Sequence, residues 1–294
     1  MRLLQNYGNL RDAALLFIIF LIGSSIAFSM DWPSSSAVTK NFGWNDDGLP
    51  HLGISFSEGE PIKAAEEGEL LFRRREGDRA SRLPSPLGSW LALDHGDGIV
   101  SIYGRFDNSS FTEISGRVEK NFALGEPGIS GWSSRNGFHF QLFDRKEKRW
   151  INPALIISQP EYRSPPVIQA VRLKDTQGRL FNPFQVGSLA QGRYTISVEA
   201  IARSPEGNPL APYRIVCLLN GSEAGVLNFE TYSARDGSLM VYRNGLVPVK
   251  QVYAPVPAYD IADVWFSRGQ TTLDIIAQDI TGNTRNVTYR FRVD

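Results

Sequence analysis

Apolar and polar residues alternate along several stretches of the C-terminal half of the chain. The clearest stretch covers residues 194–202, where Tyr, Ile, Val, Ala and Ala occupy every second position, and another covers 287–293. Alternation with a period of two predicts β-strands that bury one side and expose the other. A third stretch, 213–219, places Cys217 on its apolar side, so we expect this cysteine to be a buried packing residue.

Neither half of the chain shows a sustained apolar repeat at helical spacing. Turn-forming dipeptides such as Asn220-Gly221 and Asp236-Gly237 separate the predicted strands at intervals suited to a sandwich. Residues 158–166 hold three prolines without periodicity, which is typical of a linker. The pattern therefore predicts a nearly all-β protein with one domain over residues 30–158, a Pro-rich linker at 159–166 and a second domain over 167–294.

The N-terminus has the pattern of a secretory signal peptide. Arg2 and Arg11 precede an uncharged run from Ala13 to Phe28, which ends in small residues before Met30. We expect residues 1–29 to be removed, which makes the protein secreted, periplasmic or attached to the cell envelope, with no membrane span after cleavage. An uncleaved N-terminal anchor is the alternative, although the run is shorter than the roughly 20 residues that a span needs.

Composition excludes some kinds of chemistry. The 294 residues include 31 basic and 31 acidic side chains, so no excess of positive charge supports nucleic-acid binding. A single cysteine excludes an intramolecular disulfide and a cysteine-based zinc finger. Any metal site must therefore combine carboxylates with the three histidines, His51, His95 and His139.

Six short blocks follow one another through the N-terminal half and carry a family resemblance. They are 51–55 (HLGIS), 59–70, 93–106, 125–131, 137–142 (GFHFQL) and 150–153 (WINP). In order and spacing they resemble the lysostaphin/LytM-type zinc endopeptidases, which cut peptidoglycan cross-bridges. The resemblance covers roughly residues 41–157 and implies a LytM-type β-sandwich/barrel hybrid, the duplicated hybrid motif.

The C-terminal half carries a second, less specific resemblance. Residues 269–283 (GQTTLDIIAQDITGN) resemble the last hairpin of an immunoglobulin-like module of bacterial surface proteins. This implies an immunoglobulin-like β-sandwich over 167–294, a fold that serves adhesion, spacing or docking without naming a partner.

The first resemblance implies a metal site that is incomplete. In the family, the His and Asp of an HxxxD motif and the second His of an HxH motif bind zinc. His51 and His139 match the two histidine ligands, whereas Ser55 stands where the aspartate ligand belongs. Both histidines could equally be ordinary hydrogen-bonded residues that the fold retains.

The positions of the two catalytic histidines are also substituted. The family uses one from a YxH motif and one from the first position of HxH, and here these positions hold Arg105 and Gly137. His95 and Tyr103 match scaffold positions. Arginine adds a positive charge that cannot be removed by deprotonation. Glycine has no side chain to stabilise an oxyanion, and the loss of one such hydrogen-bond donor costs about a hundredfold in rate.

We therefore predict a degenerate member of the family without bound cofactor. Residual zinc binding is the alternative, with Asp46, Asp47 or Asp144 as substitute ligands. Arg105 could instead hold a carboxylate in the former catalytic groove. The aromatic residues predicted to form the walls of that groove are Trp44, Trp132 and Phe138.

Three functions are compatible with these residues. The first is a non-catalytic LytM-type envelope protein that binds peptidoglycan or regulates a cell-wall hydrolase. The second is an active zinc metalloendopeptidase that cleaves peptidoglycan with an unconventional ligand set. The third is a structural or adhesive envelope protein that acts through its C-terminal module.

One arginine-rich stretch departs from the family pattern. Residues 70–86 hold five arginines, Arg73, Arg74, Arg75, Arg79 and Arg82, against two acids. Such a stretch could contact an anionic polymer or an acidic partner. We favour the plainer interpretation, a solvated hairpin tip.

Overall fold

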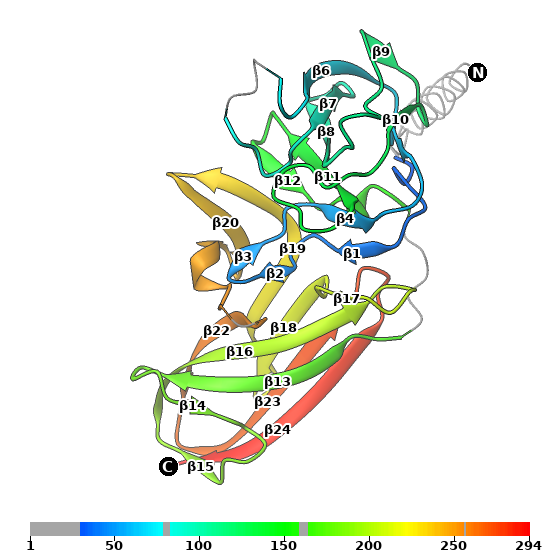
Figure 1. The fold of residues 1–294 in the computed structure, drawn as a ribbon. Helices are drawn as coiled ribbons and strands as arrows, with labels where there is room; N and C mark the ends of the chain where they lie inside the picture. The colour runs from blue at the N-terminus through cyan, green and yellow to red at the C-terminus, as the bar shows by residue number, and fades with distance from the viewer. Residues whose placement is uncertain (1–29, 79–82, 159–163, 256) are drawn as a thin grey trace, which may run out of the picture.

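The protein is built almost entirely of β-strands (Figure 1). The computed structural model describes residues 30–78, 83–158, 164–255 and 257–294. Within them the helical elements are the short 3-10 turns η1 (Pro153–Leu155) and η2 (Val249–Gln251), so the all-β prediction is confirmed. The predicted signal peptide, most of the linker, Arg79 and Arg82 lie outside the described residues. In the described ranges, no helix has the length and apolar character to cross a membrane.

The N-terminal lobe is an antiparallel sheet over one apolar core. Its strands are, in spatial order, β1 (Val38–Lys40), β4 (Ile54–Ser57), β11 (Gly137–Asp144), β8 (Ile99–Gly104), β7 (Trp90–Asp94), β6 (Gly68–Arg74) and β9 (Arg117–Val118). Two short pairs complete the lobe: β2 (Asn45–Asp46) with β3 (Leu49–Pro50), and β5 (Ile62–Lys63) with β10 (Ala123–Gly125). Tyr103, Phe138 and Phe140 are fully buried in its core.

The C-terminal lobe consists of two sheets that face each other across a second core. One holds β14 (Leu180–Phe181), β13 (Val167–Asp175), β16 (Gly192–Arg203), β17 (Pro209–Leu210) and β22 (Tyr259–Phe266). The other holds β15 (Ser188–Leu189), β24 (Thr284–Val293), β23 (Gly269–Gln278), β18 (Arg214–Leu219), β19 (Ser222–Arg235), β20 (Ser238–Arg243) and β21 (Leu246–Pro248). The described sheets are open, and none of them closes into a barrel. The immunoglobulin-like assignment of this lobe stays a prediction.

The alternating stretches of the sequence lie in β16, β18 and β24, with their apolar sides turned inward. Tyr194, Ile196 and Val198 of β16 are buried in the C-terminal core. Cys217 of β18 is fully buried, and burial raises the pKa of its thiol to about 12. The cysteine is therefore a packing residue, as expected.

The two lobes are joined through one continuous sheet. Strand β12 (Arg149–Ile151) pairs with β11 on one side and with residues 231–233 of β19 on the other. Phe42, which follows β1 of the N-terminal sheet, is buried in the C-terminal core. Asn41 also exchanges two hydrogen bonds with the backbone of Ala211, at 3.0 and 2.7 Å. The two lobes therefore pack against each other, although the Pro-rich segment predicts a linker between them.

Candidate functional site

The structure brings His51, Ser55 and His139 together at the end of strand β4. The β-ladder between β4 and β11 places Ser55 directly opposite His139. The Ser55 hydroxyl lies 3.0 Å from His51 Nε2 and 3.1 Å from His139 Nδ1. The two imidazole rings meet edge to face with their centroids 4.7 Å apart, and all three side chains are buried.

Ser55 closes this cluster as a hydrogen-bond node. A hydroxyl has one proton to donate and two lone pairs that accept, so it donates to at most one of the two ring nitrogens. At least one of the two histidines therefore carries an N–H that points to Ser55. Both facing nitrogens are then satisfied without a metal ion.

Both histidines are held neutral. Burial lowers the pKa of His51 to about 3, and the positive charges of Lys40 and Arg105 act in the same direction. Burial, the neighbouring His51 and Arg105 lower the pKa of His139 well below its usual range. A neutral imidazole is the form that hydrogen-bonds to Ser55 in the way just described.

The residues at this position do not fit a zinc ion. Zinc sites in proteins use deprotonated or neutral ligands whose set normally includes compensating charge or a third and fourth donor. Here the donors are two imidazoles and a hydroxyl that already bond to one another. In the described part of the chain, no group of three His, Cys, Asp or Glu side chains is arranged to hold a metal ion.

Two of the three aspartates proposed as substitute ligands are engaged elsewhere. Asp46 forms an ion pair with Lys40 at 2.6 Å, and both side chains are exposed. Asp144 lies 3.3 Å from Arg149 Nε and accepts hydrogen bonds from the backbone of Lys146. Asp47 is an exposed turn residue with a φ of 54°. These contacts leave the two-histidine cluster without a carboxylate.

Gly137 stands where the family has its second catalytic histidine, and this position has no room for a side chain. Its φ is 155°, and a Cβ atom would lie 2.3 Å from the Phe56 carbonyl oxygen. Any larger residue would therefore force strand β11 away from β4. A histidine would not fit at position 137 unless the backbone of β11 or β4 moved.

Arg105, at the position of the other catalytic histidine, is half-buried beside the cluster. It follows β8, and the register between β8 and β11 places its neighbour Gly104 opposite His139. The Arg105 charge lowers the pKa of both histidines, as noted above. Its Nε atom is buried and has no hydrogen-bond partner.

His95 and Tyr103, which match scaffold positions of the family, both form hydrogen bonds within the N-terminal lobe. His95 Nδ1 donates to the Glu67 carbonyl at 2.6 Å, and its Nε2 lies 2.7 Å from the Ser101 hydroxyl. The Tyr103 hydroxyl accepts from the backbone N–H of Ala65 at 2.8 Å. These bonds tie β7 and β8 to the segment that enters β6, away from the reacting position of the family.

Of the three aromatic residues predicted to line the groove, Phe138 does not. It is fully buried and stacks on Phe56 with ring centroids 4.4 Å apart. Its side chain points into the N-terminal core because alternate residues of β11 face opposite sides, and His139 takes the other side. Trp132 is 73% exposed, and Trp44 is half-buried and accepts a hydrogen bond from the His51 backbone at 2.9 Å.

A contact from the C-terminal lobe, which sequence patterns did not reveal, fixes the segment before His51. The Gly43 carbonyl accepts hydrogen bonds from the hydroxyls of Tyr253 at 2.8 Å and Tyr259 at 3.2 Å. Gly43 N–H in turn donates to the His51 carbonyl at 2.9 Å. Asn45 donates to the Ala254 carbonyl at 2.9 Å. The C-terminal lobe therefore positions the first histidine of the cluster.

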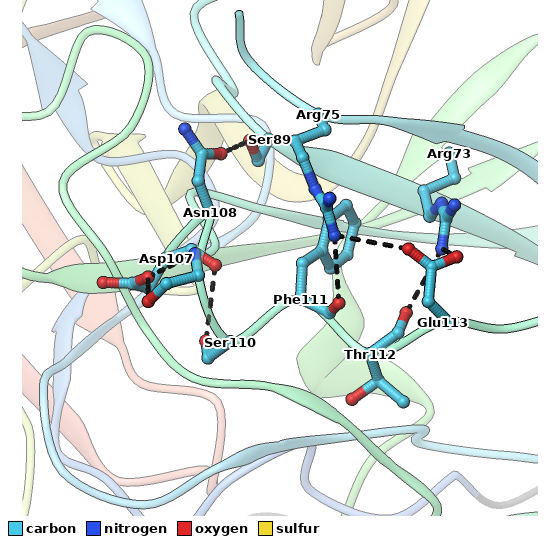
Figure 2. A network of polar contacts seen from close by, with 10 residues as sticks. Arg73, Arg75, Ser89, Asp107, Asn108, Ser110, Phe111, Thr112 and Glu113 are labelled. Atoms are coloured by element: carbon cyan, nitrogen blue, oxygen red, sulfur yellow. Dashed lines mark hydrogen bonds and ion pairs between the residues drawn. The ribbon is translucent and has the colours of Figure 1, made fainter. Parts of the chain in front are cut away.

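The three described arginines of the arginine-rich stretch form contacts within the N-terminal lobe, and Figure 2 shows those of Arg73 and Arg75. Arg73 and Arg75 both pair with Glu113, at 2.7 and 3.4 Å, and Arg75 also donates to the Phe111 carbonyl. Arg74 is buried and donates to the carbonyls of two residues in the following loop, Leu83 and Gly88. These three arginines thus hold loops together and do not form a free basic patch.

Comparison with known proteins assigns the N-terminal part of the chain to a family. Residues 50–153 match the model of Peptidase family M23, and a second family model that has no description matches residues 165–294. The murein hydrolase activators NlpD of Salmonella typhimurium and Salmonella dublin are each 25% identical over 128 residues, which is 44% of this chain and 31% of the relative. The chain thus spans about a third of the length of these relatives.

Two solved structures are similar to this chain at low TM-scores. The catalytic domain of the prophage-encoded M23 protein EnpA from Enterococcus faecalis is 24% identical, with a TM-score of 0.35 over 43% of this chain and 95% of that one. Lysostaphin from Staphylococcus simulans is 17% identical, with a TM-score of 0.35 over 74% of this chain and 87% of that one. With its six motif blocks and the family match over residues 50–153, the N-terminal lobe of this chain is a LytM-type domain of peptidase family M23.

Proposed function

We propose that this protein is a non-catalytic LytM-type protein of the cell envelope that binds peptidoglycan or regulates a cell-wall hydrolase. The observation that carries the proposal is the hydrogen-bond node at Ser55, which satisfies the two histidines of the former metal site. Without a carboxylate ligand or either catalytic histidine, the site lacks the means to activate water.

The relatives support the regulatory part of this proposal. Two relatives, each 25% identical over 128 residues, are named murein hydrolase activators. Residues 50–153 of the LytM-type lobe match the model of Peptidase family M23. We infer that the same lobe of this chain contacts a cell-wall hydrolase. The predicted signal peptide, removed or retained as an anchor, would place the protein in the compartment where such a hydrolase works.

An exposed tryptophan of the N-terminal lobe offers a specific contact for such a partner. Trp132 is 73% exposed and is the kind of large, rigid side chain that dominates protein interfaces. Its backbone N–H bonds to the Pro86 carbonyl at 3.3 Å, so its loop is held to the loop before β7. We expect Trp132 to contact the partner.

A peptidoglycan release assay tests the proposal. The full chain alone should release no fragments from dye-labelled peptidoglycan, with or without added zinc, and should raise the release by an added cell-wall amidase. Trp132→Ala should lower that stimulation about tenfold or more. Trp265→Ala is the matched control, because Trp265 is 60% exposed on the other lobe, and it should leave the stimulation unchanged.

Two results would refute the proposal. Chelator-sensitive release by the protein alone would indicate the alternative function, a zinc endopeptidase. An absence of both amidase stimulation and peptidoglycan binding would leave a structural or adhesive role for the C-terminal lobe.

A further inference from the structure

Arg105 sits at a fixed place on the backbone where three segments meet. Its N–H donates to the Leu87 carbonyl at 2.7 Å, and its own carbonyl accepts from Gly128 N–H at 2.7 Å. Its φ of 69° is in the left-handed region, which a residue with a side chain adopts at a cost of about 1 kcal/mol or more. Hydrogen bonds to two neighbouring segments therefore fix the backbone conformation of Arg105.

The Arg105 guanidinium is a charge without a partner in the described structure. Its buried Nε has no acceptor, and no ion pair joins Arg105 to any carboxylate of the described residues. Asp46 is the acid that acts on it electrostatically, but that carboxylate is 2.6 Å from Lys40 Nζ. Lys40 and Asp46 balance each other, and both histidines are neutral. The Arg105 guanidinium is therefore an uncompensated positive charge beside the Ser55 node.

A half-buried arginine without an ion-pair partner is suited to bind an anion. Burying an unpaired charge is unfavourable, and unlike lysine or histidine an arginine cannot relieve the cost by losing its proton. The missing partner must present one negative charge and match a planar fork of N–H donors. A carboxylate has both properties. A guanidinium also pairs with phosphate, but a phosphate dianion would keep one uncompensated negative charge beside a single arginine.

We propose that Arg105 binds the carboxylate of a peptide beside the Ser55 node. This inference rests on the binding role proposed above and specifies the chemical group that is bound. The source of the carboxylate is the C-terminus of a peptide or the side chain of a glutamate or aspartate. Both sources offer the same chemistry to the guanidinium.

The exposed apolar side chains near Arg105 favour a peptide over a small free acid. Arg105 and Trp132 bond through their backbone N–H groups to the successive carbonyls of Leu87 and Pro86, so both segments contact the same short loop. Ile129, next to Gly128, is 66% exposed. An acidic group on Arg105 would thus bring flanking apolar side chains onto Trp132 and Ile129.

Titration calorimetry with three short N-acetylated peptides of alanine and leucine tests the proposal on the full chain. The first has a free C-terminal carboxylate, the second is its C-terminal amide, and the third is an amide with one internal glutamate. We expect at least one carboxylate peptide to bind about tenfold or more tightly than the plain amide at low salt. Binding of the first peptide alone indicates a C-terminal source, and binding of the third indicates a side-chain source.

Variants assign the preference to this residue. Arg105→Gln should abolish the difference between acid and amide, and Arg105→Lys should weaken it severalfold because the fork is lost. Arg117→Gln is the matched control, because Arg117 pairs with Glu67 on the open surface, and it should keep the full preference. The thermal midpoint of Arg105→Gln should equal or exceed that of the wild type, since an unpaired charge is removed.

Several outcomes would overturn the proposal. They are equal affinity for acid and amide peptides, a preference that survives in Arg105→Gln, and a thermal midpoint that falls in this variant, which would indicate a structural arginine. None of these readouts depends on amidase stimulation or on zinc, so this proposal can fail while the proposed function stands.

Discussion

At the scale of single residues, the central feature is the contact of Ser55 with His51 and His139, at positions that match the metal ligands of the family. The sequence alone predicts that a serine replaces the aspartate ligand, and hence that zinc binding is weakened. It does not predict that the hydroxyl reaches both ring nitrogens, because that depends on the register between β4 and β11 and on the path of the segment before His51. The node turns three family positions into a self-contained structural contact.

Ser55→Ala should destabilise the fold. The substitution leaves two buried ring nitrogens without their shared partner, and each unsatisfied buried group costs about 1–3 kcal/mol. Urea unfolding at pH 7.5 should therefore give a lower free energy than the wild type, whereas Ser134→Ala, at an exposed position, should change it little. Equal free energies of unfolding for the two variants would show that the Ser55 hydroxyl does not hold the two histidines.

The neutral histidines also predict a pH dependence. Their folded pKa values are lowered below the ordinary value of 6.5, so the unfolded chain takes up more protons on acidification. The stability they support is complete above about pH 6.5. It falls by about 1.4 kcal/mol per pH unit for each histidine as the pH drops toward the folded values.

Urea unfolding between pH 7.5 and pH 5 measures this slope. The wild type should lose stability steadily below pH 6.5, and His139→Gln should show a shallower slope because one titrating group is gone. A wild-type free energy that is constant from pH 7 to pH 5 would show that the histidines are accessible and protonated in the folded state.

At the scale of elements, the segment that leads into His51 depends on the other lobe. Phe42 lies in the C-terminal core, the Gly43 carbonyl is held by two tyrosine hydroxyls, and Asn45 bonds to the Ala254 carbonyl. Alternation predicts the long strands β16, β18 and β24, because each has enough residues to show a period. It does not predict β2, β3, β5 or β10, which have two or three residues and are defined by their tertiary contacts.

Gly43→Ala tests this attachment. The new Cβ would lie 2.6 Å from the Phe229 ring, in addition to the strain of a φ of 85°. Gly178→Ala has nearly the same φ of 79° with no atom within 4 Å, so it reports the backbone strain alone. We expect Gly43→Ala to cost about 1–3 kcal/mol more than Gly178→Ala in the free energy of unfolding. Equal costs would mean that the lobes are not packed at this point.

At the scale of the whole molecule, the chain is two cores joined by one sheet. The Pro-rich segment suggests two separable domains, because composition reveals a linker but not the contacts that bypass it. The pairing of β12 with β19 and the burial of Phe42 couple the lobes. The family motifs predict the identity and substitutions of the site residues, but the buried position of Phe138 and the tyrosine contacts required the three-dimensional arrangement.

Calorimetry of the full chain checks this coupling. A single cooperative thermal transition, with calorimetric and van't Hoff enthalpies in agreement, is expected because unfolding of one lobe exposes part of the core of the other. Two resolved transitions would contradict the shared packing described here.

The most direct test of the central claim is the zinc content of the full chain. After incubation with zinc and removal of the excess by gel filtration, mass spectrometry of the metal should find far less than one zinc per chain in the wild type. Ser55→Asp restores a carboxylate beside the two histidines and should raise the zinc content. One tightly held zinc per wild-type chain would contradict the account, because it would show that His51 and His139 serve a metal ion and not the Ser55 node.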